Sequence, residues 1–297
     1  MKVLLTGAAG QLGQALQGQA PPRMAAAPLQ LVCCSRAELD LTDAEACRRA
    51  VLEHRPDWVI NAGAFTAVDQ AESQPHLAHA VNAAAPAALA QALAQCGGRL
   101  LQLSTDFVFN GQQGTPYQLE DPLAPLSVYG ASKAAGEAAL VAQLPEPQWC
   151  ILRTSWLYGP VGSNFLRTML RLHQQRQQIA VVADQVGCPT ATAGLAQACW
   201  RVVELGVSGK HHWSDAGAAS WYDFAIAIGE LGVEAGLLER AAAVRPISTA
   251  EYPTPAQRPS YSLMDCTKTR ARLGLVPQHW RSALAGVLIH RTALQAP

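Results

Sequence analysis

The feature that most constrains this chain is the alternation of short apolar runs with longer Ala-rich segments over its first half. The segments between the runs, such as 42–54 and 77–96, have the composition of helices. Strands that alternate with helices form βαβ units, which build a parallel sheet with helices on both faces. The alternation therefore predicts an α/β fold with a doubly wound parallel sheet. The apolar runs cover residues 2–6, 29–34, 58–63, 99–105 and 150–155.

The pattern becomes less regular after about residue 158, which indicates a second, smaller unit. A Pro-rich stretch at 246–261 is too long for a simple connection, and loops of that length are often lids or binding elements. We predict a nucleotide-binding domain and a smaller C-terminal α/β substrate-binding region. The first covers 1–158 with a return segment at about 180–208, and the second covers 159–179 and 209–297.

Charge and composition favour a small-molecule partner in a reducing compartment. The formal net charge is zero, so neither nucleic acid nor an anionic membrane finds an electrostatic footprint. No apolar run approaches the roughly 20 residues of a membrane span, and the N-terminus lacks the apolar core of a secretory signal. The eight cysteines form no CxxC pair. We expect a cytoplasmic chain without disulfides or bound metal.

Three glycines follow the first apolar run and open the first helical segment. Gly7, Gly10 and Gly13 have the spacing GxxGxxG. One glycine allows a tight turn, one lets the backbone approach a pyrophosphate, and one lets the helix pack closely on the sheet. Their position directly after a strand predicts a Rossmann-type dinucleotide site. A Gly-rich turn that binds no ligand is the alternative.

The end of the second apolar run indicates which dinucleotide binds. An acid there bonds the ribose 2′-hydroxyl of NAD, whereas an Arg accommodates the 2′-phosphate of NADP. This chain has Ser35 and Arg36 at that place, and no acid. Arg36 favours NADPH, with NADH still possible, unless its side chain is merely solvated. Asp40 and Leu41 follow and can border the adenine.

Tyr129 and Lys133 lie four residues apart, which places them on one face of a helix. A phenol has a pKa of about 10, and a nearby ammonium favours its ionised form. The pair can therefore act as a general acid and base beside a cofactor, with Lys133 also holding the nicotinamide ribose. YxxxK is common by chance, so a packed ring beside a solvated amine is the alternative.

The fourth apolar run supplies a context for that pair, because it ends in Ser104, Thr105 and Asp106. Ligands of open α/β sheets bind beyond the carboxyl ends of the strands. A hydroxyl there can bond a substrate oxygen, and the other hydroxyl can simply bond the backbone. A Ser or Thr, a Tyr and a Lys together match the arrangement of short-chain dehydrogenases and reductases.

Several motifs extend the match over residues 1 to about 285. "NAGA", "STDFVF", "YGASKAAGE" and "RTSWLYG" resemble the extended short-chain dehydrogenase/reductase family that acts on sugar nucleotides. "GQLG", "TAVDQAE", "NFLRTML", "DQVGCPT" and "PTPAQRPSYSLM" resemble the branch of that family that completes dTDP-rhamnose synthesis. The resemblance implies NAD(P)H-dependent reduction of the C4 keto group of a dTDP-bound 4-keto-6-deoxysugar.

The resemblance also implies roles for individual residues. Tyr129 would protonate the C4 oxygen, Lys133 would lower the pKa of the tyrosine, and Thr105 would bond the keto oxygen. Arg258 is a further candidate, for the substrate diphosphate, because a guanidinium fits phosphate oxygens; a capping or solvent-facing role is its alternative. The cofactor would contact Gly10, Gln11, Leu12, Asp40, Leu41, Ala64, Phe65 and Thr66. The sugar nucleotide would contact Val68, Asp69, Asp106 and Trp156, unless Trp156 is a core residue.

One departure from the family bears on assembly. Some members are described as dimers joined by a metal that acidic side chains hold. Here Ala15 stands on the first helix, and "PTATAGLAQ" offers no acid, whereas Mg²⁺ needs carboxylates. We predict a monomer or a homodimer without a bridging metal. Two other functions stay open: another nucleotide-sugar reductase or epimerase, and a non-catalytic NADP-binding regulatory subunit.

Overall fold

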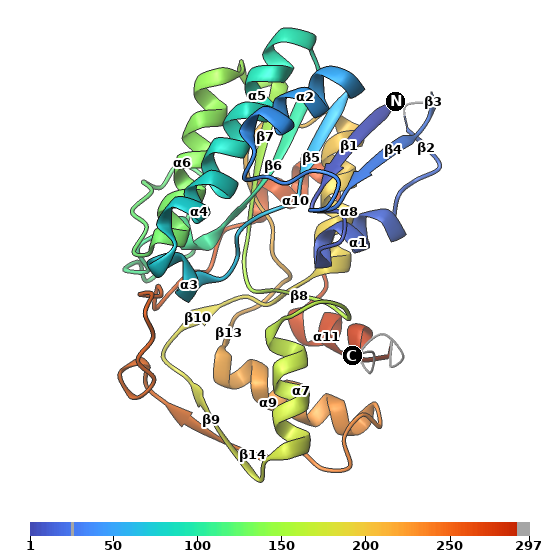
Figure 1. Cartoon of the computed structure of the whole chain (residues 1–297). Helices are drawn as coiled ribbons and strands as arrows, with labels where there is room; N and C mark the ends of the chain where they lie inside the picture. Colours follow the sequence, from blue (N-terminus) through green and yellow to red (C-terminus); the bar gives the residue numbers. More distant parts are fainter. Residues whose placement is uncertain (25–26, 290–297) are drawn as a thin grey trace.

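A six-stranded sheet forms the centre of the computed structural model, which describes residues 1–24 and 27–289. Its order is β12-β7-β6-β5-β1-β4, and every neighbouring pair is parallel (Figure 1). The first five strands in chain order coincide with the apolar runs of the sequence. The strands are β1 (Lys2–Thr6), β4 (Gln30–Cys34), β5 (Trp58–Asn61), β6 (Arg99–Thr105), β7 (Trp149–Thr154) and β12 (Gly209–His212).

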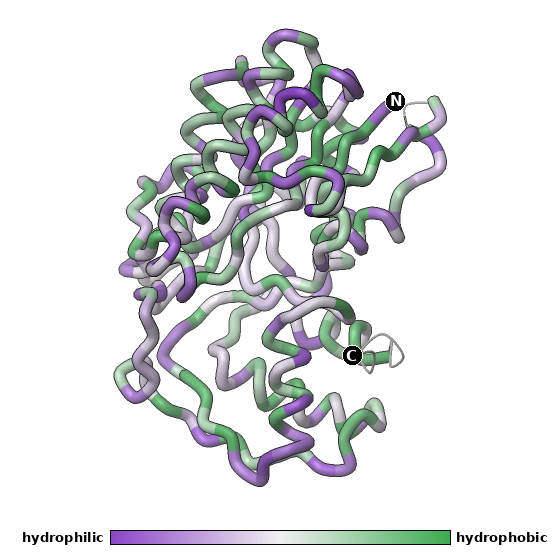
Figure 2. The backbone as a smooth tube through the Cα atoms, in the orientation of Figure 1, coloured by the Kyte–Doolittle hydropathy of each residue, from purple (hydrophilic) through white to green (hydrophobic). Residues whose placement is uncertain are grey.

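Helices cover both faces of this sheet. Successive side chains of a strand point to opposite faces, so Val3 and Leu5 enter one core and Leu4 enters the other. In Figure 2 these central strands are hydrophobic along most of their length. The two cores confirm the predicted doubly wound α/β sheet. The first face packs on α1 (Gln11–Gly18) and α8 (Thr192–Leu205), and the second on α2 (Ala44–His54), α5 (Ala85–Cys96) and α6 (Val128–Gln143).

The helical stretch Pro75–Cys96 combines α4 (Pro75–His79), the π-helical turn η1 (Ala80–Ala84) and α5. Among the helices of the described residues, this stretch is the one whose length and apolar composition would be enough to cross a membrane. Half of its most apolar window is buried inside the fold, and α5 lies between α2 and α6. Such packing is that of a core helix.

A third core, separate from the two beside the sheet, lies below the carboxyl ends of the strands in the view of Figure 1 and forms the lower lobe of the molecule. Phe224 and Ile228 are fully buried at its centre. The core is built by α7 (Phe165–Gln175), α9 (Trp221–Glu234) and α11 (Trp280–Ile289), together with a small parallel sheet of β9 (Gln178–Val182) and β14 (Ala243–Ile247).

Short elements complete the chain. Three pairs of two-residue strands lie outside the two larger sheets. They are β2 (Arg23–Met24) with β3 (Ala27–Pro28), β8 (Leu157–Tyr158) with β11 (Thr190–Ala191), and β10 (Val186–Gly187) with β13 (Ala219–Ser220). The short helices are α3 (Val68–Ser73), α10 (Thr267–Leu273), η2 (Asp106–Val108), η3 (Glu146–Gln148) and η4 (Thr249–Glu251).

The predicted domain division stays a prediction, but the structure shows how the chain alternates between the lobe of the main sheet and the lower lobe. β9 pairs with β14 in the lower lobe, α8 returns to the main sheet, and β12 extends the sheet beside β7. The predicted loop at 246–261 begins within β14 and contains η4. Residues 290–297 of the predicted second region lie outside the described residues.

Candidate active site

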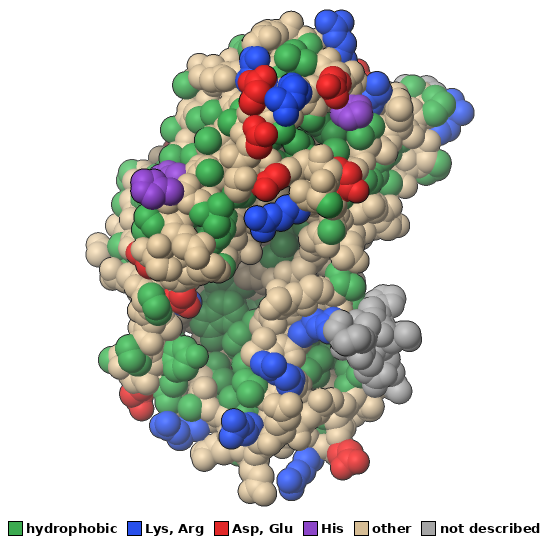
Figure 3. All heavy atoms as spheres, viewed as in Figure 1, with side chains coloured by type: hydrophobic (Ala, Val, Ile, Leu, Met, Phe, Trp, Pro, Cys, Tyr) green, Lys and Arg blue, Asp and Glu red, His purple; other side chains and the backbone are tan. Residues whose placement is uncertain are grey.

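A cavity of about 710 Å³ lies at the carboxyl ends of β1, β4, β5, β6 and β7, between the two lobes. Figure 3 shows the molecule hollowed at this level. The parallel strands end there, as in other open α/β sheets. Most of the predicted site residues line the cavity: Gly7, Gly10, Gln11, Leu12, Arg36, Asp40, Leu41, Ala64, Phe65, Thr66, Thr105, Tyr129, Lys133 and Trp156. The predicted site residues that do not line the cavity are Gly13, Val68, Asp69, Asp106 and Arg258.

The glycine loop forms a cradle in which Gly7 and Gly13 leave no room for a side chain. Gly7 has φ +65°, and a Cβ on it would lie 2.6 Å from the backbone of Gly63. A Cβ on Gly13 would lie 2.2 Å from the Gly7 carbonyl oxygen, so Gly13 serves the approach of α1 to the strand. Gly10 is exposed at the N-cap of α1. An exposed backbone at a helix N-terminus fits the pyrophosphate of a dinucleotide.

The turn after β4 presents Arg36. This side chain is exposed and lines the cavity, and its contact with a 2′-phosphate stays a prediction. The acid three residues from Ser35, Glu38, accepts hydrogen bonds from the Ser35 backbone N–H and hydroxyl. Glu38 does not line the cavity, whereas Arg36 does, so this turn presents a positive charge to the cavity. Asp40 accepts a hydrogen bond from the Thr42 N–H at 2.9 Å.

Thr105, Tyr129 and Lys133 line the same cavity. Ser127 caps α6 by accepting from the Gly130 N–H at 3.2 Å, which starts the helix just before Tyr129. Lys133 is buried, and its Nζ donates to the Leu103 carbonyl oxygen at 2.6 Å. The helix thereby places the phenol and the amine beside the end of β6.

The electrostatics of this cluster differ in one respect from our expectation. Burial raises the pKa of Tyr129 to about 12, against a lowering effect of the Thr105 hydroxyl. Burial lowers the pKa of Lys133 to about 8. We expected Lys133 to lower the pKa of Tyr129, but burial dominates the shift, and the group that lowers this pKa is the Thr105 hydroxyl and not Lys133. A phenol with a raised pKa keeps its proton, which suits a proton donor.

Asp106 lies beneath the cavity and not in its wall. It is 1% exposed, and the Thr105 hydroxyl donates to its Oδ1 at 3.0 Å. Burial raises the pKa of Asp106 to about 6, while hydrogen bonds from Ser262 and Thr105 oppose that effect. In this structure Asp106 orients the hydroxyl of Thr105.

Trp156 supplies a flat wall to the cavity and is held in a rare backbone conformation. Its φ is +45°, and its ring stacks on Trp221 at 3.6 Å between centroids. Gly187 passes so close that a Cβ on it would lie 2.6 Å from the Trp156 ring. Positive φ in a bulky residue costs energy and persists where the surroundings enforce it. Trp156 lines the cavity and also packs against the core built by α7, α9 and α11, so a contact of its ring with substrate stays a prediction.

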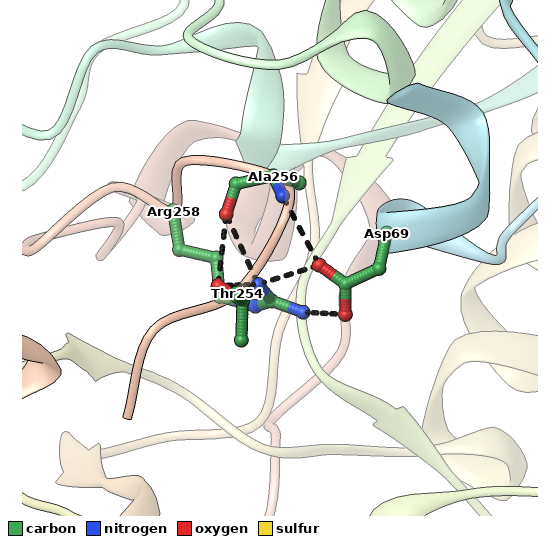
Figure 4. Close-up of polar contacts among 4 residues, drawn as sticks. All are labelled: Asp69, Thr254, Ala256 and Arg258. Atoms are coloured by element: carbon green, nitrogen blue, oxygen red, sulfur yellow. Dashed lines mark hydrogen bonds and ion pairs between the residues drawn. The ribbon is translucent and has the colours of Figure 1, made fainter. Parts of the chain in front are cut away.

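Asp69 and Arg258, both predicted to bind substrate, bind each other (Figure 4). Arg258 donates to both carboxylate oxygens, at 3.0 and 2.7 Å, and also to Thr254 and the Ala256 carbonyl. The Ala256 N–H donates to the same carboxylate at 3.2 Å. The pair thus fastens the Pro-rich loop to α3, and Arg258 lowers the pKa of Asp69. A contact of either residue with substrate stays a prediction.

Two groups of buried polar residues near the site escaped the sequence analysis. Asn82 lies in the π-helical turn, and its side chain accepts a hydrogen bond from the Phe65 N–H and donates to the Phe65 carbonyl oxygen. It also donates to the Ser132 hydroxyl, so it connects the loop after β5 to α6. Glu137 and Arg153 form a buried ion pair. Glu137 follows Lys133 at the same four-residue spacing as Lys133 follows Tyr129, a signal that the sequence did contain.

Within residues 1–24 and 27–289, no group of three or more His, Cys, Asp or Glu side chains is arranged to hold a metal. All eight cysteines are free. The donors that line the cavity are backbone amides, hydroxyls, an amine and a guanidinium, which suit phosphates and sugars. The site therefore fits a dinucleotide.

The sheet order, the glycine cradle and the Thr–Tyr–Lys cluster together define the class of nucleotide-binding short-chain dehydrogenases and reductases. Comparisons with known proteins narrow the class. Residues 1–292 match the family model described as RmlD substrate binding domain, and the chain belongs to this family. The predicted resemblance is thereby confirmed.

Individual relatives agree with this assignment. The chain is 38% identical over 292 residues to the dTDP-4-dehydrorhamnose reductase of Aggregatibacter actinomycetemcomitans, covering 96% of this chain and 98% of the relative. It is 43% identical over 290 residues to that of Streptomyces griseus, covering 95% and 91%. The crystal structure of dTDP-4-dehydrorhamnose reductase from Bacillus anthracis in complex with NADP superposes with a TM-score of 0.89, at 35% identity over 97% of this chain and 98% of the other.

Proposed function

We propose that this chain reduces the C4 keto group of dTDP-4-dehydro-6-deoxy-L-mannose with NADPH, giving dTDP-L-rhamnose in the last step of its synthesis. One observation carries the proposal: Thr105, Tyr129 and Lys133 line the same cavity as the glycine cradle. Relatives named dTDP-4-dehydrorhamnose reductase, and a related structure in complex with NADP, support it.

The cavity residues divide the task of holding the cofactor. The backbone at Gly10, Gln11 and Leu12 binds the pyrophosphate, and Lys133 holds the nicotinamide ribose. When bound, NADPH supplies the hydride that reduces the carbonyl carbon. Asp40 and Leu41 border the adenosine, and Arg36 the 2′-phosphate. Ala64, Phe65 and Thr66 contact the cofactor farther in, where Asn82 fixes the backbone of Phe65.

The chain's own residues complete the reduction by moving a proton. The carbonyl oxygen becomes an alcohol, so it must gain a proton as the carbon is reduced. Tyr129 holds its proton because burial raises the pKa of the phenol, and donates it to the C4 oxygen. Thr105 turns its hydroxyl proton from Asp106 to the same oxygen and stabilises the developing alkoxide. Trp156 offers an apolar face to the C6 methyl group of the deoxysugar.

The test is the loss of NADPH absorbance when the purified protein meets dTDP-4-dehydro-6-deoxy-L-mannose, with the sugar product identified by mass. We expect steady oxidation of NADPH and a product two hydrogens heavier. A folded protein that binds NADPH but leaves the sugar unreduced contradicts the proposal. That outcome would favour the regulatory-subunit alternative, and an isomerised sugar without NADPH consumption would favour an epimerase.

Arg36→Ala is expected to weaken NADPH binding roughly tenfold or more, because a charge-assisted hydrogen bond to the 2′-phosphate is lost. NADH lacks that phosphate, so its dissociation constant should stay close to the wild-type value. Fluorescence titration with each cofactor measures both constants in one preparation. An equal loss for the two cofactors rules out the 2′-phosphate contact.

The proposal extends to assembly and location. The substrate class is a dTDP-sugar, and we infer a monomer or a homodimer without a bridging metal, located in the cytoplasm. The zero net charge gives no reason to expect nucleic acid as a partner. The predicted substrate contacts of Val68, Asp69, Asp106 and Arg258 remain to be tested by substitution.

A further inference from the structure

A third ionisable residue, Glu137, lies on the same face of α6 as Tyr129 and Lys133. Glu137 lies one helical turn beyond Lys133, which is the spacing at which side chains of a helix meet. Its side chain is 3% exposed, and it accepts a hydrogen bond from the Ser104 hydroxyl at 2.5 Å. Ser104 itself lines the cavity. The carboxylate is therefore buried directly behind the proposed catalytic cluster, and the reaction scheme above does not use it.

Arg153 on β7 fixes this carboxylate. Its Nε and one terminal nitrogen donate to the two oxygens of Glu137 at 2.9 and 2.7 Å, a bidentate geometry. The guanidinium lies over the ring of Phe109 and contacts His212 at 3.2 Å. Burial and Arg153 lower the pKa of His212 to about 3, so His212 is neutral and does not compete for the carboxylate.

We propose that Glu137 is a positioning residue that keeps Lys133 in its ammonium form, a role that rests on the proposed function of Lys133. Lys133, Arg153 and Glu137 are all buried; Arg153 forms the ion pair with Glu137, and Lys133 lies one helical turn before that carboxylate on the same face of α6. Arg153 holds Glu137 in a single orientation, and Ser104 connects it to the cavity wall. An amine buried without a carboxylate loses its proton, and a neutral Lys133 would bond the nicotinamide ribose and polarise the site less well.

The electrostatics agree with this geometry. Burial lowers the pKa of Lys133 to about 8, and the field of Glu137 opposes this effect. The pKa of Lys133 is thus close to physiological pH. Removing the charge of Glu137 would lower this pKa further and would therefore change the fraction of Lys133 that is protonated at that pH. Other ionisable groups on α6 and on the elements packed against it are Tyr129 on α6, Asp69 and Glu72 on α3, His76 and His79 on α4, Cys96 on α5, Arg99 on β6, Asp106 on η2 and Cys150 and Arg153 on β7.

The titration of Lys133 can be measured without any turnover. The sequence contains four lysines, so labelling lysine with ¹³C at Cε gives four NMR signals, and Lys133→Met assigns one of them. In Glu137→Gln we expect the midpoint of Lys133 to fall by about one to three pH units relative to the wild type, the size of effect that a close opposite charge has. An unchanged midpoint in a folded variant overturns the proposal.

Two further variants separate charge from packing. His212→Gln alters the contact of Arg153 while leaving the carboxylate in place, so the midpoint of Lys133 should not move. Glu137→Gln/Arg153→Met removes both charges of the ion pair and serves if the single variant does not fold; it should still lower the midpoint. A fall in His212→Gln as large as in the Glu137 variants would mean that packing controls Lys133, which also overturns the proposal.

NADPH binding distinguishes this inference from the proposed function. If Lys133 must be charged to hold the ribose, the pH at which NADPH affinity declines should move downward with the NMR midpoint in Glu137→Gln. Fluorescence titration without sugar reports that affinity. A wild-type protein that binds NADPH but reduces no sugar contradicts the proposed function and leaves this measurement intact, whereas an unmoved binding profile contradicts the inference alone.

Discussion

Tyr129→Phe is expected to lower kcat for NADPH-dependent reduction roughly 10³-fold, while the affinity for NADPH stays close to that of the wild type. Removing a positioned general acid typically costs between about 10² and 10⁴ in rate. The substitution deletes one oxygen and keeps the ring, which packs edge-on against Phe107 at 5.6 Å between centroids. Because α6 is capped by Ser127 and not by the phenol, the helix should be unaffected.

The pH dependence of the wild type should agree with the same role. Burial raises the pKa of Tyr129, so the protonated donor persists well above neutral pH. The pKa of Lys133 is lowered to about 8, so the loss of the ammonium, and not of the phenol proton, should set the alkaline limit of kcat. Tyr222→Phe on α9 removes a hydroxyl outside the cavity and serves as the matched control. Wild-type turnover in Tyr129→Phe would show that the tyrosine is only a packing residue.

The sequence predicted the central sheet well because burial on both faces leaves a clear apolar signal. The run at 99–105 coincides with β6 (Arg99–Thr105), and the run at 2–6 with β1. β12 (Gly209–His212) was not predicted, because it is an edge strand of sequence GKHH with one neighbour in the sheet. Its polar composition gives no strand pattern, and only pairing with β7 makes it a strand.

The sequence predicted residues that line the cavity where these residues lie in short motifs. The glycines and the Tyr–Lys pair are close in sequence, and all except Gly13 line the cavity. The interactions that sequence reasoning missed join distant segments. Asp69 and Arg258 are 189 residues apart, and each meets its partner only because the Pro-rich loop folds back onto α3. No local pattern encodes such a meeting, so the sequence could not predict this ion pair, and a contact of either residue with substrate stays a prediction.

Arg153→Met is expected to reduce the free energy of unfolding by about 3–5 kcal/mol, the usual cost of leaving one partner of a buried ion pair alone. Arg153 and Glu137 are 1% and 3% exposed, so solvent cannot replace the lost cation. Glu137 would keep only the Ser104 hydroxyl and the field of Lys133. Urea unfolding at pH 7, followed by circular dichroism, measures the loss.

Two comparisons make this result specific to an uncompensated buried charge. Arg281→Met breaks an ion pair with Glu230 of the same 2.7 Å length whose side chains are 40% and 52% exposed, and it should cost less than about 1 kcal/mol. Glu137→Gln/Arg153→Met removes both buried charges and should recover most of the stability, because a Met side chain packs well against the Phe109 ring that the guanidinium now covers. If the double variant is as unstable as Arg153→Met alone, the guanidinium stabilises the fold through its contacts with Leu119 and His212 and not by balancing Glu137.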